Sequence, residues 1–160
     1  MESLKGLEVG KLSYDLYLVG LESFVICTVD FVLKKGNQFF LIKRNEGAFA
    51  DEWFVAGGRQ NRGENEVEAL YRIAKRELGV NENDIISATF SHCQDVFNGA
   101  GKNVEGPLPA WHSKWHFYVV EVASDFEPRL DTTSSEGIWF TQPPPVPEPV
   151  HFALKKAKII

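Results

Sequence analysis

The sequence predicts an α+β domain in which a mixed β-sheet is sandwiched between helices. The chain has 160 residues, the usual length of one domain, so we expect a single domain over residues 1–160. Hydrophobic residues make up 44% of the chain, which is enough for a sizeable core. Apolar runs typical of strands occur mostly in neighbouring pairs, and two helical segments lie at different points along the chain.

The first half of the chain predicts a hairpin and a further short strand. Residues 22–33, ESFVICTVDFVL, are rich in β-branched and aromatic residues and are typical of a buried strand. The turn KKGN joins them to residues 38–44, QFFLIKR, which is typical of a hairpin. Residues 52–58, EWFVAGG, predict another strand that ends in a glycine turn.

The second half predicts two helices and the remaining strands. Residues 64–78 predict a helix that ends at Gly79. The other expected elements are strands at residues 85–92, 116–123 and 137–140, a long loop at residues 98–113, an extended proline-rich connector at residues 142–149 and a helix at residues 150–160.

Charge and composition exclude several classes of protein. The net charge is −5 and no basic stripe is present, so we expect no binding of long nucleic acid. No apolar run approaches the roughly 20 residues of a membrane span, and the N-terminus shows no signal-peptide pattern. Cys27 and Cys93 have neither metal spacing nor a disulfide pattern, so we expect two small buried residues in a cytoplasmic protein. Such an acidic chain can still bind a small phosphorylated ligand through a few local cations.

The helix at residues 64–78 has one apolar side. At about 100° per residue, the predicted core stripe comprises Val67, Leu70, Ala74 and Leu78. The predicted solvent-facing side comprises Glu68, Lys75 and Arg76.

Glu77 lies at the edge of the apolar stripe, where an unpaired carboxylate is costly. Its partner would be an Arg side chain or a metal ion. The double glycine Gly57-Gly58 would bring a bare backbone close to the helix. The Gly58 carbonyl and the Glu77 carboxylate could then share a hard cation such as Mg²⁺.

Residues 58–80 resemble the Nudix box, G-x5-E-x7-R-E-U-x-E-E-x-G-U, in which U is a bulky aliphatic residue. The positions that match in register are Gly58, Glu64, Arg72, Glu77, Gly79 and Val80. The positions that depart from it are Ile73 and Arg76, which replace acids, and Ala74, which replaces a bulky aliphatic residue. The resemblance implies a Nudix fold and a hydrolase. The usual Nudix enzyme attacks a diphosphate phosphorus and relies on an acid cluster for its metals, and two of those acids are absent here.

One branch of the family, the GDP-mannose mannosyl hydrolases, also lacks acids at these two positions. The chain is similar to that group from about residue 25 to residue 154, in the segments VDFVL, FFLIKR, WFVAGGR, FYVVEV and PVHF. The resemblance implies substitution at the anomeric carbon of a nucleotide sugar, which releases sugar and nucleoside diphosphate. Cations must then stabilise the charge that grows on the departing diphosphate.

The resemblance assigns roles to four side chains. Arg44 and Arg59 would assist the leaving diphosphate, Tyr118 would contact it, and Asp30 would orient the sugar or an arginine. Judged without the family, each has a plainer alternative. Arg44 also fits a surface position of the hairpin, Tyr118 fits the core, and Asp30 fits a structural hydrogen bond inside an apolar strand.

The resemblance also implies a metal site and a structural ion pair. Mg²⁺ or Mn²⁺ would bind the Glu77 carboxylate and the Gly58 carbonyl, and Glu64 would pair with Arg72 to brace the box. Dimers are common in the resembling group, so a homodimer is compatible with it.

The general base of that group has no direct counterpart here. The group places a glutamine metal ligand and a histidine base before the last Trp-containing strand, where this chain has about Thr133 and Ser134. Glu136 is our candidate base and Asp131 the alternative, although both also fit solvated loop acids. The other histidines of this part of the chain are His92, His112 and His116, which lie in or near residues 90–117. The aromatic segment WHSKWH, residues 111–116, could line a base or sugar pocket or lie on the surface.

The sequence therefore predicts a metal-dependent hydrolase of a small nucleotide sugar of the GDP-mannose kind. Two alternatives stay open. The first is a diphosphatase that attacks a nucleoside diphosphate derivative at phosphorus. The second is a catalytically impaired domain that only binds a nucleotide or a protein.

Overall fold

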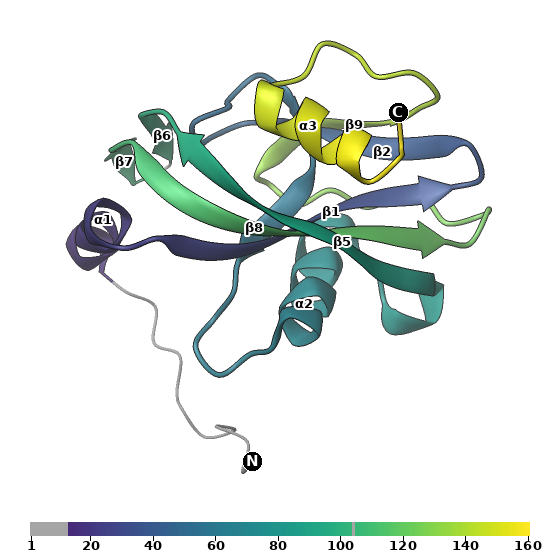
Figure 1. Ribbon diagram of the computed structural model, residues 1–160, viewed down its shortest axis with the longest axis horizontal. Helices are drawn as coiled ribbons and strands as arrows, with labels where there is room; N and C mark the ends of the chain where they lie inside the picture. Colours follow the sequence, from purple (N-terminus) through teal and green to yellow (C-terminus); the bar gives the residue numbers. More distant parts are fainter. Residues whose placement is uncertain (1–12, 104) are drawn as a thin grey trace.

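A mixed β-sheet forms the centre of the fold (Figure 1). The computed structural model describes residues 13–103 and 105–160. Within these ranges the helices are α1 (Tyr14–Ser23), α2 (Glu66–Leu78) and α3 (Glu148–Lys156), and a 3₁₀ turn spans Glu82–Asp84. The strands are β1 (Ile26–Lys35), β2 (Gln38–Arg44), β3 (Trp53–Phe54), β4 (Ala56–Arg59), β5 (Ile85–Asn98), β6 (Gly101–Asn103), β7 (Gly106–Leu108), β8 (Trp111–Val122) and β9 (Ser134–Phe140).

The topology agrees with the predicted fold class. Five strands lie in the order β3-β2-β1-β8-β5, while β4 also pairs with β1 and β9 with β2. Strands β1 and β8 run parallel, and the other pairs are antiparallel. Figure 1 shows α2 and α3 on opposite sides of this sheet. The prediction of a mixed sheet sandwiched between helices is confirmed.

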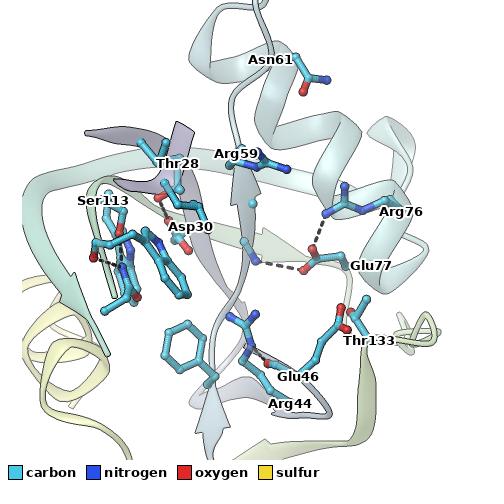
Figure 2. A pocket seen from close by; sticks show the side chains of 18 of the residues that line it. Thr28, Asp30, Arg44, Glu46, Arg59, Asn61, Arg76, Glu77, Ser113 and Thr133 are labelled. Atoms are coloured by element: carbon cyan, nitrogen blue, oxygen red, sulfur yellow. Dashed lines mark hydrogen bonds and ion pairs between the residues drawn. The ribbon is translucent and has the colours of Figure 1, made fainter. Parts of the chain in front are cut away.

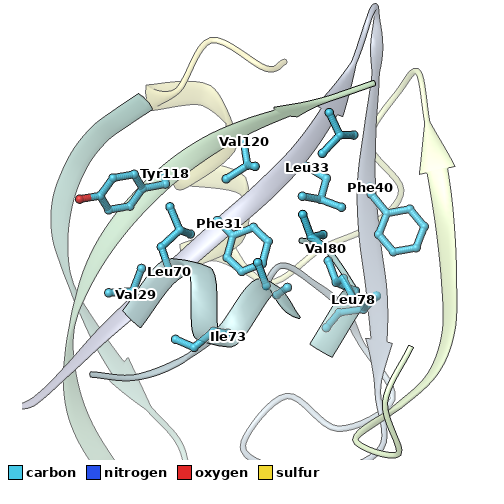
Figure 3. Close-up of a cluster of buried hydrophobic side chains, with 14 of the residues drawn as sticks. Val29, Phe31, Leu33, Phe40, Leu70, Ile73, Leu78, Val80, Tyr118 and Val120 are labelled. Carbon is cyan, nitrogen blue, oxygen red and sulfur yellow. The ribbon is translucent and has the colours of Figure 1, made fainter. Parts of the chain in front are cut away.

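Alternating residues of β1 contribute to two cores, one on each face of the sheet. Val29 and Phe31 pack with Leu70 and Ile73 of α2 (Figure 3). Val32, on the other face, packs with the residues of α3 that are fully buried, Val150, Ala153 and Leu154. Full burial of one such large apolar side chain stabilises the fold by about 1.5–3 kcal/mol. Because successive side chains of β1 point to opposite faces of the sheet, Val29 and Phe31 hold α2 against one face.

Both ends of α2 are set by local sequence. Asn65 accepts a hydrogen bond from the Glu68 N–H, and Glu68 accepts one from the Asn65 N–H, each at 2.9 Å. This capping box satisfies two backbone donors at the start of the helix. At the other end, Gly79 adopts φ 68°, a left-handed conformation that favours glycine. The helix position is therefore fixed along its axis, which places its last turn beside β4.

The buried face of α2 differs from the predicted stripe at one position. Val67 is 45% exposed, so its predicted place in the core is wrong. Ala69 and Ile73 are fully buried instead, because the helix is rotated to pack them on β1. Ile73 occupies a position where the Nudix box has an acid, and here it belongs to the core.

Other expectations are corrected by the structure. Helix α1 was not predicted, and the expected loop at residues 98–113 contains the β6–β7 hairpin and the start of β8. Cys27 and Cys93 are exposed free thiols and not buried residues. In β5 the neighbouring His92 takes the buried position, so period-two alternation leaves Cys93 on the exposed face. No helix of the described residues is long and apolar enough to cross a membrane.

A close approach between β1 and β4 needs a glycine. Asp30 is paired with Gly57 in the antiparallel register. A Cβ atom on Gly57 would lie 2.1 Å from Asp30 Oδ1 and 3.0 Å from Asp30 Cα. The Asp30 side chain therefore passes directly over the bare Gly57 Cα, and this contact lies beneath the site described below.

We predict that Gly57→Ala destabilises the protein. The added methyl group overlaps the Asp30 carboxyl, and such overpacking costs about 1–3 kcal/mol. The measurement is the free energy of unfolding in urea. Gly99→Ala is the matched control, because a Cβ there meets nothing within 4 Å. Equal stability of the two variants would show that Asp30 does not lie over Gly57.

Candidate functional site

A pocket of about 300 Å³ lies beside β4, between the start of β1 and the last turn of α2 (Figure 2). Several elements contribute to its wall, including α1, β1, β2, β4, α2, β5 and β8. Its arginines are Arg44, Arg59, Arg72 and Arg76, and its acids are Asp30, Glu46 and Glu77. Cations therefore outnumber acids around this pocket, although the whole chain is acidic.

The structure brings most of the predicted site residues together. Those that line the pocket are Asp30, Arg44, Gly58, Arg59 and Glu77. Tyr118 and Glu136 do not line it. The two residues come from different parts of the sheet, so they do not form a second common site.

Tyr118 is a buried residue of β8 that packs in the core beneath α2. Its hydroxyl donates a hydrogen bond of 2.8 Å to Glu66 Oε2. Burial and this acidic partner raise the pKa of Tyr118 to about 12. Glu136 is an exposed residue of β9, opposite Lys43 in the register of the sheet. Its role as a general base therefore stays a prediction from the sequence.

Glu77 is 8% exposed and both of its carboxylate oxygens have partners. Oε2 accepts a hydrogen bond of 3.0 Å from the Gly57 N–H. Oε1 lies 2.6 Å from Arg76 Nη2 in an ion pair. Burial raises the pKa of the Glu77 carboxyl, while Arg76 and the Gly57 N–H act in the opposite direction. The carboxylate thus links the last turn of α2 to β4 (Figure 2).

Arg76 was expected on the solvated side of the helix, and the structure corrects this. Its side chain is half exposed, but its guanidinium lies against Gly58 and lines the pocket. Adjacent residues on a helix point about 100° apart, which is why the wheel separated Arg76 from Glu77. The long Arg76 side chain bends back to the Glu77 carboxylate. The sequence indicated such a contact only through the need of Glu77 for a partner.

Arg72 and Glu64 form the ion pair that the sequence predicted. Arg72 Nε lies 2.5 Å from Glu64 Oε1, and Nη2 donates to Glu64 Oε2 at 2.8 Å. This pair lowers the pKa of the Glu64 carboxyl. Arg72 Nη2 also donates to the Arg59 carbonyl at 2.9 Å. The pair therefore holds the end of β4 against α2, which confirms its bracing role.

Two further arginines are positioned by aromatic rings. The Arg59 guanidinium lies 4.3 Å from the centre of the Tyr17 ring, which belongs to α1. Arg44 lies 5.0 Å from the Phe54 ring, and its Nε donates to the Glu46 carbonyl at 3.1 Å. Arginine stacks well on aromatic faces while its N–H groups stay available at the edge. Sequence reasoning did not identify Tyr17, because α1 has no strong helical pattern.

Asp30 forms the floor of the pocket and is 5% exposed. Thr28 Oγ1 donates a hydrogen bond of 2.5 Å to its carboxylate. Burial raises the pKa of Asp30 to about 7. The Thr28 hydrogen bond and Arg44 lower it, whereas the charge of Glu77 raises it further. Asp30 is thus close to half-protonated at neutral pH.

Strand β8 separates the segment WHSKWH into two faces. Trp111, Ser113 and Trp115 line the pocket, two residues apart along the strand. His112 instead pairs with Asp95 at 2.9 Å, and His116 lies 3.4 Å from Glu66. The predicted aromatic pocket wall is thus present, and it is made by the tryptophans and not by the histidines. Asn98 also lines this part, and its Nδ2 donates to Ser113 Oγ at 2.8 Å.

Thr133 and Ser134, which align with the glutamine and the histidine of the resembling group, differ in their position relative to the pocket. Thr133 lines the pocket, whereas Ser134 is the first residue of β9. The Asp131 carboxylate accepts hydrogen bonds from the Thr133 N–H and hydroxyl, at 2.9 and 2.5 Å. Asp131 therefore holds the loop in place and does not line the pocket.

The donor atoms near Glu77 do not fit a resident divalent cation. Mg²⁺ requires about six oxygen ligands. The Glu77 carboxylate, which we expected to bind the metal with the Gly58 carbonyl, is already paired with Arg76 and the Gly57 N–H. Within residues 13–103 and 105–160, no group of three or more His, Cys, Asp or Glu side chains could hold a metal ion.

Comparisons with solved structures show the same fold in other proteins. The chain matches a MutT NUDIX hydrolase from Burkholderia pseudomallei with a TM-score of 0.68 and 22% identity, over 84% of this chain and 98% of that chain. It matches the NUDIX domain of Shewanella oneidensis NrtR, solved with ADP ribose, with a TM-score of 0.61 and 16% identity, over 92% and 97%. At these identities the likeness concerns the fold.

Sequence comparison gives the family. The chain is 36% identical over 78 residues to the low-salt glycan biosynthesis protein Agl8 of Haloferax volcanii, which covers 48% of this chain and 49% of that protein. The chain thus spans about half the length of this curated relative. A sequence model of the NUDIX domain matches residues 27–152, most of the chain, so the protein belongs to the NUDIX family.

Proposed function

We propose that this protein is a hydrolase of a nucleotide sugar that releases sugar and nucleoside diphosphate by attack at the anomeric carbon. The observation that carries the proposal is the set of four arginines around one pocket in a chain of net charge −5. Nudix hydrolases typically are metal-dependent pyrophosphohydrolases. A local excess of guanidinium groups supports a diphosphate as the ligand, because one guanidinium can donate two parallel hydrogen bonds to phosphate oxygens.

The pocket offers separate places for the parts of such a ligand. Arg59 and Arg44 would contact the diphosphate and stabilise the charge that develops as it leaves. The ring of Trp111, which is partly exposed, would stack on the base, which typically contributes about 1–3 kcal/mol per base, while the buried Trp115 supports this wall. Asp30, beneath them, would accept a hydrogen bond from a sugar hydroxyl when it is ionised.

The relatives support a nucleotide-sugar ligand in two ways. The NrtR domain was solved with ADP ribose, a nucleoside diphosphate joined to a sugar. Agl8 is named for glycan biosynthesis, a process that consumes activated sugars. Attack at phosphorus is less well supported, because Ile73 lies in the core and Arg76 replaces the second missing acid.

A second candidate is a domain that binds a nucleotide sugar without turning it over. It is favoured by the pairing of Glu77 with Arg76, because this pair occupies the carboxylate that the Nudix resemblance assigns to a metal ion. It is also favoured by the histidines, since none of the four in the chain lines this pocket.

Product analysis separates these functions. Wild-type protein is incubated with GDP-mannose, UDP-glucose and ADP-glucose, with and without Mg²⁺, and the products are identified by mass spectrometry in ¹⁸O-labelled water. We expect nucleoside diphosphate and free sugar, with the label in the sugar, because attack occurs at carbon. Label in any phosphate group, whether of a nucleotide or of a sugar phosphate, would contradict the proposed reaction. Saturable binding without products would establish the second candidate.

We predict that Arg59→Gln weakens binding of the preferred nucleotide sugar by roughly tenfold or more, because a charged hydrogen bond contributes about 1.5–3 kcal/mol. The measurement is the dissociation constant from calorimetry. Arg62→Gln is the matched control, since Arg62 is exposed on the same connection and does not line the pocket. If both variants bind like the wild type, the diphosphate lies elsewhere.

We predict that Asp30→Asn changes the pH dependence of stability. Folded Asp30 keeps its proton up to about pH 7, whereas an unfolded Asp loses it near 3.9. The folded state thus binds the extra proton in this window, and wild-type stability falls with rising pH by up to about 1.4 kcal/mol per unit. Asn removes this fall. Urea unfolding between pH 4 and pH 8 tests it.

Asp125→Asn is the control for this experiment, because Asp125 is exposed. It should leave the pH dependence of the wild type unchanged. Curves for Asp30→Asn and wild type that run parallel over the whole range would show that burial does not raise the pKa of Asp30.

A further inference from the structure

Arg76 places a guanidinium group at a fixed position in the pocket wall. Its Nη2 lies 2.6 Å from Glu77 Oε1 and 3.1 Å from the place that a Cβ on Gly58 would occupy. Figure 2 shows the Arg76 guanidinium at the end of α2, beside β4. The Glu77 carboxylate lies on one side of this guanidinium and Arg59 on the other. The cation is therefore held where the Nudix resemblance would place a metal.

The chemistry around Glu77 favours this guanidinium over a divalent ion. One carboxylate balances one guanidinium, and the Gly57 N–H uses the second oxygen. A divalent ion within reach of Glu77 would lie next to a fixed like charge, and repulsion at about 4 Å costs several kcal/mol at the dielectric of a protein surface. Ile73, fully buried beside Gly58, supplies no oxygen ligand.

We infer that Arg76, positioned by Glu77, replaces the divalent cation as the group that binds the diphosphate of the ligand, so that binding is independent of metal. This inference rests on the proposed function of the pocket. A guanidinium has five N–H donors in a planar fork. One bond to Glu77 leaves donors for phosphate oxygens, and Arg76 is 54% exposed, which makes them accessible.

The inference also explains why Glu77 is present without its companion acids. A free arginine side chain is mobile, and ordering it for each binding event costs conformational entropy. The Glu77 carboxylate, fixed in turn by the Gly57 N–H, holds the guanidinium ready. Glu77 is thus a positioning residue, and Arg76 is the group that touches the ligand.

The test is calorimetric titration of wild-type protein with ADP, GDP and UDP, in EDTA and in excess Mg²⁺. We expect saturable binding of at least one nucleotide in EDTA, with no tighter binding in Mg²⁺, because the metal neutralises the phosphate charge that Arg76 binds. Arg76→Gln should weaken the binding in EDTA by roughly ten- to a hundredfold. Lys75→Gln, the same change of charge one residue earlier on the exposed side, should bind like the wild type.

Arg76→Glu provides a readout that loss of folding would not imitate. It places a second carboxylate next to Glu77, so we expect binding in EDTA to be lost and binding in Mg²⁺ to appear. Arg76→Lys keeps the charge without the fork, and it should bind in EDTA more weakly than the wild type. Thermal unfolding identifies any variant that does not fold, and the comparison then uses the remaining ones.

Each outcome bears on a different claim. Wild-type binding only in Mg²⁺ would overturn the metal-independent role of Arg76 and leave the pocket proposal standing. Binding of Arg76→Gln and Arg76→Lys in EDTA as tight as that of the wild type would also overturn it. No binding of any nucleotide or nucleotide sugar in either buffer would overturn the proposed function itself.

Discussion

The buried Glu77 carboxylate is the contact on which the site depends. It receives the Gly57 N–H from β4 and the Arg76 guanidinium from its own helix, so it joins the sheet to the last turn of α2. Glu77 is buried, so loss of either partner would leave its charge without compensation, whereas the half-exposed Arg76 stays partly solvated. The arrangement therefore keeps a cation at the pocket wall in the unliganded protein. A site that already contains a cationic side chain can bind an anion without first binding a metal ion from solution.

Charge in this protein is concentrated by the fold and not by composition. The chain is acidic overall, yet the ends of β2 and β4 and one side of α2 bring four arginines to one pocket. Each arginine is held by a ring, a carbonyl or a carboxylate. Opposite them, strand β8 presents Trp111 and Trp115 on the same face. An anionic group and an aromatic ring can thus be bound side by side, which is the composition of a nucleotide.

The sequence predicts much of the fold because local rules determine it. The buried strand β1, the turn before β2 and the end of α2 at Gly79 are predicted from the sequence, and the Nudix spacing identifies Gly58, Glu77 and the Glu64–Arg72 brace. Other features depend on contacts between distant segments. The helical wheel could not show that Arg76 bends back over Gly58, and no periodicity marks Tyr17 as the support of Arg59. Tyr118 was assigned by resemblance and Glu136 as a replacement for the missing histidine, and the fold places both outside the pocket. Residue type and spacing thus predicted the backbone of the site better than the direction of its long side chains.

The most direct test of the account is a crystal structure of the wild-type protein with its preferred nucleoside diphosphate, grown in EDTA. We expect diphosphate oxygens within hydrogen-bond distance of Arg76 and Arg59, with the base against Trp111 and the Glu77–Arg76 pair intact. A diphosphate joined to Glu77 through a retained metal ion, with Arg76 displaced into solvent, would contradict it. So would a nucleotide bound at any place other than this pocket.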